Sequence, residues 1–192
     1  MQPRRTIGTI LVVFCLLWAS SATGLPGDEP DVATPPALAL LLWQQGYALH
    51  LIGRYELATK YFRKSIEVYP TAEAHTFLGW SLSYLGQIEE AIDECKTAID
   101  LDPDYGNPYN DIGVYLIDLG RIDEAIPWLE KATLAKRYCC YEFPHFNLGR
   151  VHLMKGRLLE ARRSLERALD YEPNYLPAQR ALEYIRAQGQ DL

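Results

Sequence analysis

The chain has 192 residues, of which 48% are hydrophobic and 23% are charged, a composition typical of one globular domain. Acidic side chains outnumber basic ones by 25 to 19, and the formal net charge is −6. Because phosphate binding requires a basic surface, this balance disfavours nucleic acid as a partner.

Residues 1–22 show the three regions of a secretory signal peptide in order. Arg4 and Arg5 precede an apolar run from Ile7 to Trp18, and small residues follow up to Ala22. The run is short for a membrane span, which needs about 20 apolar residues. We expect cleavage after Ala22 and export to a periplasm or to the exterior, with a bacterial origin favoured. The alternative is an uncleaved anchor, which would be the chain's only membrane contact.

Cleavage would make the net charge of the mature chain more negative and would leave a short linker at its N-terminus. Removing Arg4 and Arg5 leaves 17 basic and 25 acidic side chains, a net charge of −8. Residues 23–36 are polar, contain several prolines and have no apolar period, so they are predicted to form a flexible linker.

The rest of the chain, residues 37–192, is dominated by a repeat with a period of 33 to 36 residues. Each copy has a Gly, a second Gly seven residues later, an Ala twelve later and a small residue nineteen later. A Pro follows twenty-four residues after the first Gly in three of the four copies. The first glycines are Gly46, Gly79, Gly113 and Gly149.

These offsets predict a pair of helices in each copy. The second Gly suits the left-handed conformation that ends a helix. After it, apolar residues recur at steps of three and four, as in the run from Ile88 to Leu101. The first Gly and the later small residues would let the two helices cross closely, because larger side chains would hold the backbones apart.

A period near 34 with Gly, Ala and Pro at these offsets resembles the tetratricopeptide repeat (TPR). The resemblance implies an all-α fold, a right-handed α-solenoid of four helix-turn-helix repeats. The repeats are expected at about residues 39–71, 72–105, 106–139 and 142–175. Residues 176–187 would form a C-terminal capping helix with a polar outer side, which a stacked array needs for solubility.

Two departures from the repeat pattern are specific. Gln45 stands where the other copies have Leu78, Ile112 and Leu148. In the third copy, Arg137 replaces the expected Pro, and two extra residues lengthen the next junction. The junction at residues 136–141 is therefore the expected place for a changed step between repeats.

Three cysteines remain after cleavage, an odd number for a compartment in which disulfides form. Cys95 occupies a position that is apolar in the other copies, so we expect a buried small hydrophobe. Cys139 and Cys140 are compatible with two free thiols, a vicinal disulfide or half of an intermolecular bridge. Structural zinc requires four ligands, so no metal site is predicted.

His145 and His152 share a helix face, but both occupy interior positions of the fourth copy. We expect them to be packed, hydrogen-bonded side chains. The sequence contains no nucleophile motif, no H-E-x-x-H and no phosphate-binding glycine loop. The chain is therefore predicted not to be an enzyme and to need no cofactor.

In the TPR family the binding surface is usually the concave groove lined by the first helix of each pair. Trp80 is expected at its centre, beside Tyr47, although several of the aromatic residues would equally fit between adjacent first helices. Lys and Asn residues that bind a terminal carboxylate in chaperone-binding members have no full counterpart here. The predicted groove residues are Trp43, Tyr47, Trp80, Tyr84, Asn107, Asn110, Phe143, Phe146 and Arg150.

Aromatic side chains of this kind contribute much of the binding energy of protein interfaces. An extended apolar or aromatic protein segment is thus the expected ligand, with Asn107, Asn110 and Arg150 bonding its backbone or an acidic residue. The favoured hypothesis is an exported adaptor that assists assembly of an envelope or surface structure. In this respect the chain resembles small bacterial repeat proteins that assist pilus or secretin assembly. The alternative is a carbohydrate-binding protein whose sugar stacks on Trp43 and Trp80.

Overall fold

The structure, a computed structural model, describes residues 34–188, and all regular structure in this range is helical. The all-α class is therefore confirmed. The predicted signal peptide and most of the predicted linker lie outside the described residues. The helices are α1 (Pro35–Leu51), α2 (Tyr55–Val68), α3 (Ala72–Tyr84), α4 (Ile88–Leu101), α5 (Asn107–Asp118), α6 (Ile122–Leu134), α7 (Glu142–Met154), α8 (Leu158–Tyr171) and α9 (Leu176–Ala187).

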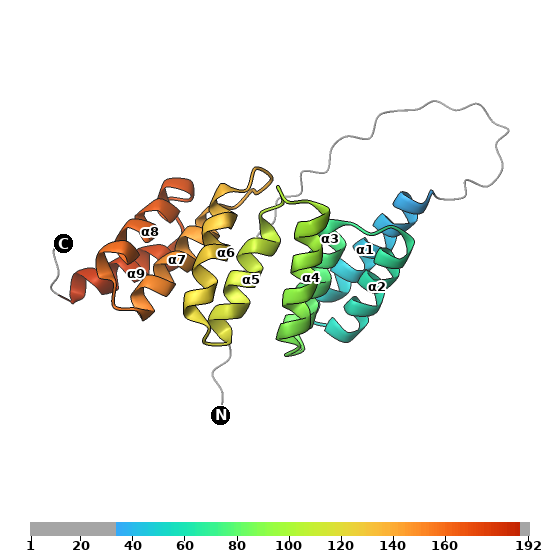
Figure 1. Cartoon of the computed structure of the whole chain (residues 1–192), viewed down its shortest axis with the longest axis horizontal. Coiled ribbons are helices and arrows are strands. Elements are labelled where there is room, and N and C mark those ends of the chain that lie inside the picture. Colours follow the sequence, from blue (N-terminus) through green and yellow to red (C-terminus); the bar gives the residue numbers. More distant parts are fainter. Residues whose placement is uncertain (1–33, 189–192) are drawn as a thin grey trace. The chain divides into compact units, whose positions relative to one another are not determined.

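The helices form a repeat array (Figure 1). The first eight pack as four pairs, α1 with α2 through α7 with α8, and each pair packs against the next. The first helices also contact one another, α1 with α3, α3 with α5 and α5 with α7. One surface of the described array is consequently built from α1, α3, α5 and α7.

The first glycine of each repeat lies where the paired helices cross. A Cβ atom on Gly113 of α5 would lie 2.5 Å from Cδ2 of Leu129 in α6. On Gly79 of α3 it would lie 2.9 Å from the carbonyl oxygen of Ala91 in α4. Carbon atoms normally approach only to about 3.5 Å. The close crossing expected from the sequence is therefore present.

The second glycine of each repeat ends the first helix. Gly53, Gly86, Gly120 and Gly156 have φ angles of +76°, +79°, +74° and +68°, in the left-handed region. No other residue type in the described range has a positive φ. Because an L side chain is disfavoured there, the spacing of these glycines fixes where each unit turns.

The start of α1 differs from the predicted boundary. The linker was expected to extend to Pro36, but α1 begins at Pro35. Proline suits the first turn of a helix, where its missing N–H has no intrahelical acceptor and its φ is already helical. The prolines therefore begin the helix instead of separating it from the linker.

The junction between α6 and α7 is irregular, as predicted, and Arg137 organises it. Arg137 forms ion pairs with Glu73 (2.7 Å) and Asp102 (2.6 Å), and its guanidinium lies 4.1 Å from the ring centroid of Tyr105. Its backbone N–H donates to the carbonyl of Asp104 at 2.8 Å. The residue that replaces the expected proline thus joins the second and third repeats.

The cysteines take one of the states that the sequence left open. Cys139 and Cys140 are joined as a vicinal disulfide within this junction. Cys95 is fully buried in α4, as expected for a small hydrophobe, and burial raises the pKa of its thiol.

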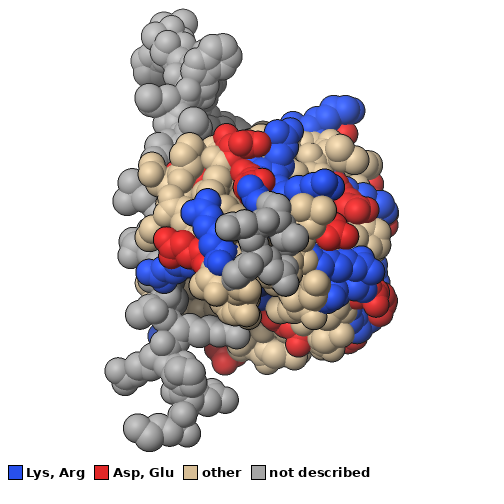
Figure 2. Space-filling model, turned by 90° about the vertical axis from the view of Figure 1, so that its left-hand side faces the viewer, with Lys and Arg blue, Asp and Glu red and all other residues tan. Residues whose placement is uncertain are grey.

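Helix α9 closes the C-terminal end. Ala178, Leu182 and Ile185 are buried, whereas Arg180 and Glu183 are exposed. Figure 2 views the molecule from this end and shows basic and acidic side chains interspersed over it. The described C-terminal end therefore has the polar outer side expected of a cap.

Candidate functional site

Aromatic side chains form a continuous row across the first two repeats. At its beginning, Trp43 stacks on Tyr47 in α1, with ring centroids 5.4 Å apart and planes within 8°. Phe77 of α3 meets both rings edge-on, at 5.1 and 5.3 Å. Such edge-to-face and offset contacts add stability beyond the apolar area that they bury.

The row continues through His50, whose ring lies 5.0 Å from that of Trp80 at an interplanar angle of 22°. Tyr84 lies edge-on to His50 at 5.4 Å and stacks on Tyr55 at 4.5 Å. Trp80 and Tyr84 remain 38% and 55% exposed. We refer to these rings as the aromatic row: Trp43, Tyr47, His50, Tyr55, Phe77, Trp80 and Tyr84.

His50 is the uncharged centre of this row. It is buried, its Nδ1 lies 2.9 Å from the hydroxyl of Ser81, and burial lowers its pKa to about 4. The imidazole is therefore neutral at neutral pH. Its contact with Trp80 is a stacking contact between two uncharged rings, not a cation–π contact.

The sequence predicts Trp80 beside Tyr47, and in the structure Phe77 links the two rings. Trp80 packs on His50, and Phe77 is the residue of α3 that contacts Tyr47. Tyr55, on the second helix of the first repeat, was also not predicted. The position of Phe77 has no fixed residue type in the repeat, whereas that of Tyr55 is apolar in the other copies and is typical of a core residue.

A chain of polar side chains crosses from α7 to α5. Arg150 donates to the amide oxygen of Asn147 at 3.0 Å, and Asn147 donates to the amide oxygen of Asn110 at 3.0 Å. Asn110 in turn donates to the carboxylate of Asp111 at 3.4 Å. Both asparagines are buried, and burial raises the pKa of Asp111 to about 7. The Asn110 side chain is thus bonded within the protein.

The remaining predicted residues lie at the start of α5 and along α7. Asn107 is half-buried in the first turn of α5. Phe143 and Phe146 of α7 pack against Tyr175, with centroids 5.7 and 5.3 Å apart. The guanidinium of Arg150 lies 6.0 Å from the ring of Phe146. These aromatic residues form a group separate from the aromatic row.

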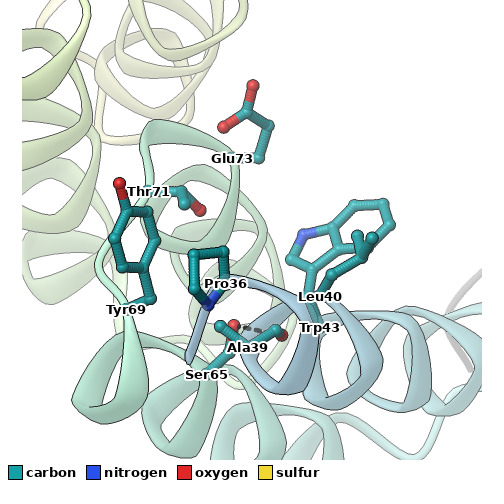
Figure 3. A pocket seen from close by; sticks show the side chains of 8 residues that line it. All are labelled: Pro36, Ala39, Leu40, Trp43, Ser65, Tyr69, Thr71 and Glu73. Atoms are coloured by element: carbon teal, nitrogen blue, oxygen red, sulfur yellow. Dashed lines mark hydrogen bonds between the residues drawn. The ribbon is translucent and has the colours of Figure 1, made fainter. Parts of the chain in front are cut away.

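A pocket of about 340 Å³ lies beside the aromatic row, between α1 and the start of α3 (Figure 3). The polar groups of its wall are mostly bonded already: Ser65 donates to the carbonyl of Ala39, and Thr71 accepts from the backbone of Ala74. The pocket is lined by Pro36, Ala39, Leu40, Trp43, Ser65, Tyr69, Thr71 and Glu73.

One donor at this pocket has no partner. The indole Nε1 of Trp43 is buried and makes no hydrogen bond, and Figure 3 shows it turned toward the side on which Pro36 and Thr71 lie. Leaving a buried donor unpaired costs about 1–3 kcal/mol.

The two histidines of the fourth repeat are packed, but the hydrogen bonding predicted for them is not met at Nδ1 of His152. His145 stacks on Tyr171 at 5.4 Å, and the Nδ1 of His152 is buried without a partner. Burial lowers the pKa of both imidazoles. Within residues 34–188, no group of three or more His, Cys, Asp or Glu is arranged to hold a metal ion.

Family profiles described as tetratricopeptide repeat match residues 39–71, 72–105, 107–139 and 143–175, which together are more than half of the chain. The chain belongs to the tetratricopeptide repeat family. A curated relative, small glutamine-rich tetratricopeptide repeat-containing protein 2 of Mycosarcoma maydis, is 32% identical over 80 residues. That match spans 41% of this chain and 23% of the relative, so the relative is much longer than the matched part.

Several solved structures have the same fold. Pseudomonas aeruginosa PilF is 23% identical with a TM-score of 0.70, and the match covers 82% of this chain and 79% of PilF. PilW, described as a type IV pilus biogenesis factor, is 21% identical with a TM-score of 0.71 over 78% and 69% of the two chains. YrrB, a TPR protein with an unusual peptide-binding site, is 21% identical with a TM-score of 0.62 over 76% and 74%.

TPR arrays are protein-interaction scaffolds that bind protein or peptide partners on extended surfaces, and the family is generally non-catalytic. None of the helices within residues 34–188 is long and apolar enough to cross a membrane.

Proposed function

We propose that this chain is a non-catalytic adaptor of an exported compartment, and that it holds an extended apolar or aromatic protein segment in the groove lined by its first helices. The observation that supports this best is the aromatic row, which leaves Trp80 and Tyr84 partly exposed while other rings hold them in place. Rigid aromatic anchors with little rotamer entropy left to lose are favourable centres for a protein interface.

The pocket beside the row defines a second point of attachment. Its wall is largely apolar, and it is wide enough to take an apolar side chain. The ligand is therefore an extended segment that carries an apolar side chain at this position.

The polar contribution to binding falls mainly to Arg150. Asn110 is buried and bonded to Asn147 and Asp111, so it orders the surface rather than facing the ligand. Arg150 is half-buried, uses one of its donors on Asn147, and has further donors for a carbonyl or an acidic side chain. Phe143 and Phe146 would contact the apolar part of the same segment.

The proposed export and the proposed role in assembly are supported by the N-terminal sequence and by the fold. The order of charged, apolar and small residues in residues 1–22 favours export. Likeness to PilF and PilW at this level of identity concerns the fold, and it makes assembly of an envelope or surface structure the first role to test. Trp43 is packed between Tyr47 and Phe77, which favours a protein segment over a sugar stacked on this ring.

The experiment compares two tryptophans in a binding assay. The protein would be used to capture its partner from the exporting cell, and the affinity of the purified partner would be measured for Trp80→Ala and for the matched control Trp128→Ala on α6. Truncating a central aromatic anchor costs about 2 kcal/mol or more, which is roughly thirtyfold in affinity. We expect that loss for Trp80→Ala alone, with far-UV helicity unchanged. Equal affinity of both variants, or a loss only for Trp128→Ala, would refute the proposed site.

A further inference from the structure

The outer side of α1 carries a stripe of exposed side chains. They recur at steps of three and four along the helix, and they lie on the side of α1 away from Trp43 and Tyr47, which contact α3. We call this stripe the α1 outer face: Leu38, Leu41, Gln45, Ala48 and Ile52, all exposed.

The corresponding positions of every later first helix are covered by the preceding repeat. The second, third and fourth positions of the stripe are occupied in α3 by Ala74, Leu78 and Ser81, all buried. The same three positions are also buried in the later first helices. They are Pro108, Ile112 and Tyr115 in α5, and Pro144, Leu148 and Val151 in α7. The α1 outer face is thus a packing face of the repeat, and in residues 34–188 nothing precedes α1 to cover it.

This face is also free of charge. Residues 35–51 contain no Asp, Glu, Lys or Arg, and apart from Gln44 and Gln45 the apolar residues of α1 are spread around the helix, which is typical of a helix buried all round. Leu41 and Ile52 are nonetheless 50% and 71% exposed. The opposite end of the described array differs, because α9 presents Arg180, Glu183 and Arg186 to solvent beside the exposed Leu176 and Tyr184.

We propose that the α1 outer face is a homodimer interface, in which α1 of one copy packs against α1 of a second copy around a two-fold axis. Head-to-tail stacking would bring the apolar α1 against the charged α9, whereas two-fold pairing brings apolar against apolar and closes the assembly. Although the whole chain is acidic, the two surfaces that meet carry no like charges to repel each other.

Gln45 fits the centre of this interface. It interrupts the apolar stripe where the other copies have Leu78, Ile112 and Leu148. In coiled coils a single Asn or Lys in the apolar seam fixes the register and the number of paired helices, and Gln45 would act in the same way here. Ala48 beside it allows the two backbones to approach. The dimer would leave both aromatic rows open, so two segments of a partner could be held together.

The first test measures mass by sedimentation equilibrium, using the protein as isolated from the cell that produces it. We expect a dimer, and we expect Leu41→Glu to raise its dissociation constant by about thirtyfold or more. The matched control is Leu134→Glu, which replaces a leucine that is 80% exposed on α6 and should leave the dimer intact. Far-UV circular dichroism would confirm that both variants are folded.

The second test uses cross-linking. Cys95 is buried and Cys139 is bonded to Cys140, so Gln45→Cys introduces a new accessible thiol. We expect it to form a disulfide-linked dimer, which Leu134→Cys should not. A monomeric protein at high concentration, or a dimer that survives Leu41→Glu, overturns the proposal. So does a monomer that dimerises only after residues 1–33 are removed, or one that binds anionic phospholipid vesicles through this face, because another occupant would then cover α1.

Discussion

Replacing Gly113 with Ala tests how the repeats are held together. In a helix interior the substitution normally gains about 1 kcal/mol, because Ala has the higher helix propensity. Here the new Cβ would lie 2.5 Å from Cδ2 and 2.6 Å from Cγ of Leu129. Leu129 is fully buried and cannot turn away. Overpacking of this kind costs about 1–3 kcal/mol, so the clash should outweigh the gain in propensity.

We expect a net destabilisation of up to about 2 kcal/mol, which lowers Tm by up to roughly 8 °C for a domain of this size. Thermal and urea unfolding followed by far-UV circular dichroism would measure it. The control is the same substitution in a Leu129→Ala background, where the clash is gone and the gain of helix propensity, about 1 kcal/mol, should reappear. A stabilising Gly113→Ala in the wild-type background would refute the proposed helix crossing.

Three further predictions concern the thiols, a carboxyl group and the N-terminus. Changing Cys139 and Cys140 to Ser should leave helicity and the melting curve nearly unaltered, because a bond between adjacent residues closes no long loop; loss of folding would show a structural role. Burial holds the pKa of Asp111 near 7, so the folded state binds the extra proton and this group's contribution to stability falls as pH rises from about 4 to about 7. Asp111→Asn should therefore stabilise increasingly over that range in urea titrations and level off above it, and a constant difference at all pH values would contradict the assignment. Mass spectrometry of the protein from its native cell should find a mature chain that begins near Thr23, whereas an intact Met1 in a membrane fraction would show an anchor.

The fold could be predicted because its determinants are local and repeat in phase. Gly86 must adopt a left-handed conformation wherever the chain turns, and Gly79 must lie where a side chain would meet the neighbouring helix. Both requirements act within one helix pair, so glycine recurs at the same two positions in every copy. The predicted start of α1 was less accurate, because Pro35 is compatible with both a linker and a first helical turn.

The arrangement of the candidate site was less predictable, because it depends on contacts between repeats. The position two residues before the first glycine holds Gln44, Phe77, Asp111 and Asn147, so no pattern marks it. In the structure Phe77 completes the aromatic row, and Asn147 holds Asn110 from 37 residues away. The orientation of such side chains is decided by the neighbouring copy, which differs from repeat to repeat.

The central claim is that the aromatic row holds a protein segment, and site-specific photo-cross-linking in the exporting cell tests it most directly. A photoreactive amino acid would replace Tyr84, which is 55% exposed in the row, or Leu134, which is 80% exposed on α6. We predict a covalent adduct with one partner protein from position 84 and none from position 134. An adduct only from position 134, or no protein adduct from position 84, would contradict the account.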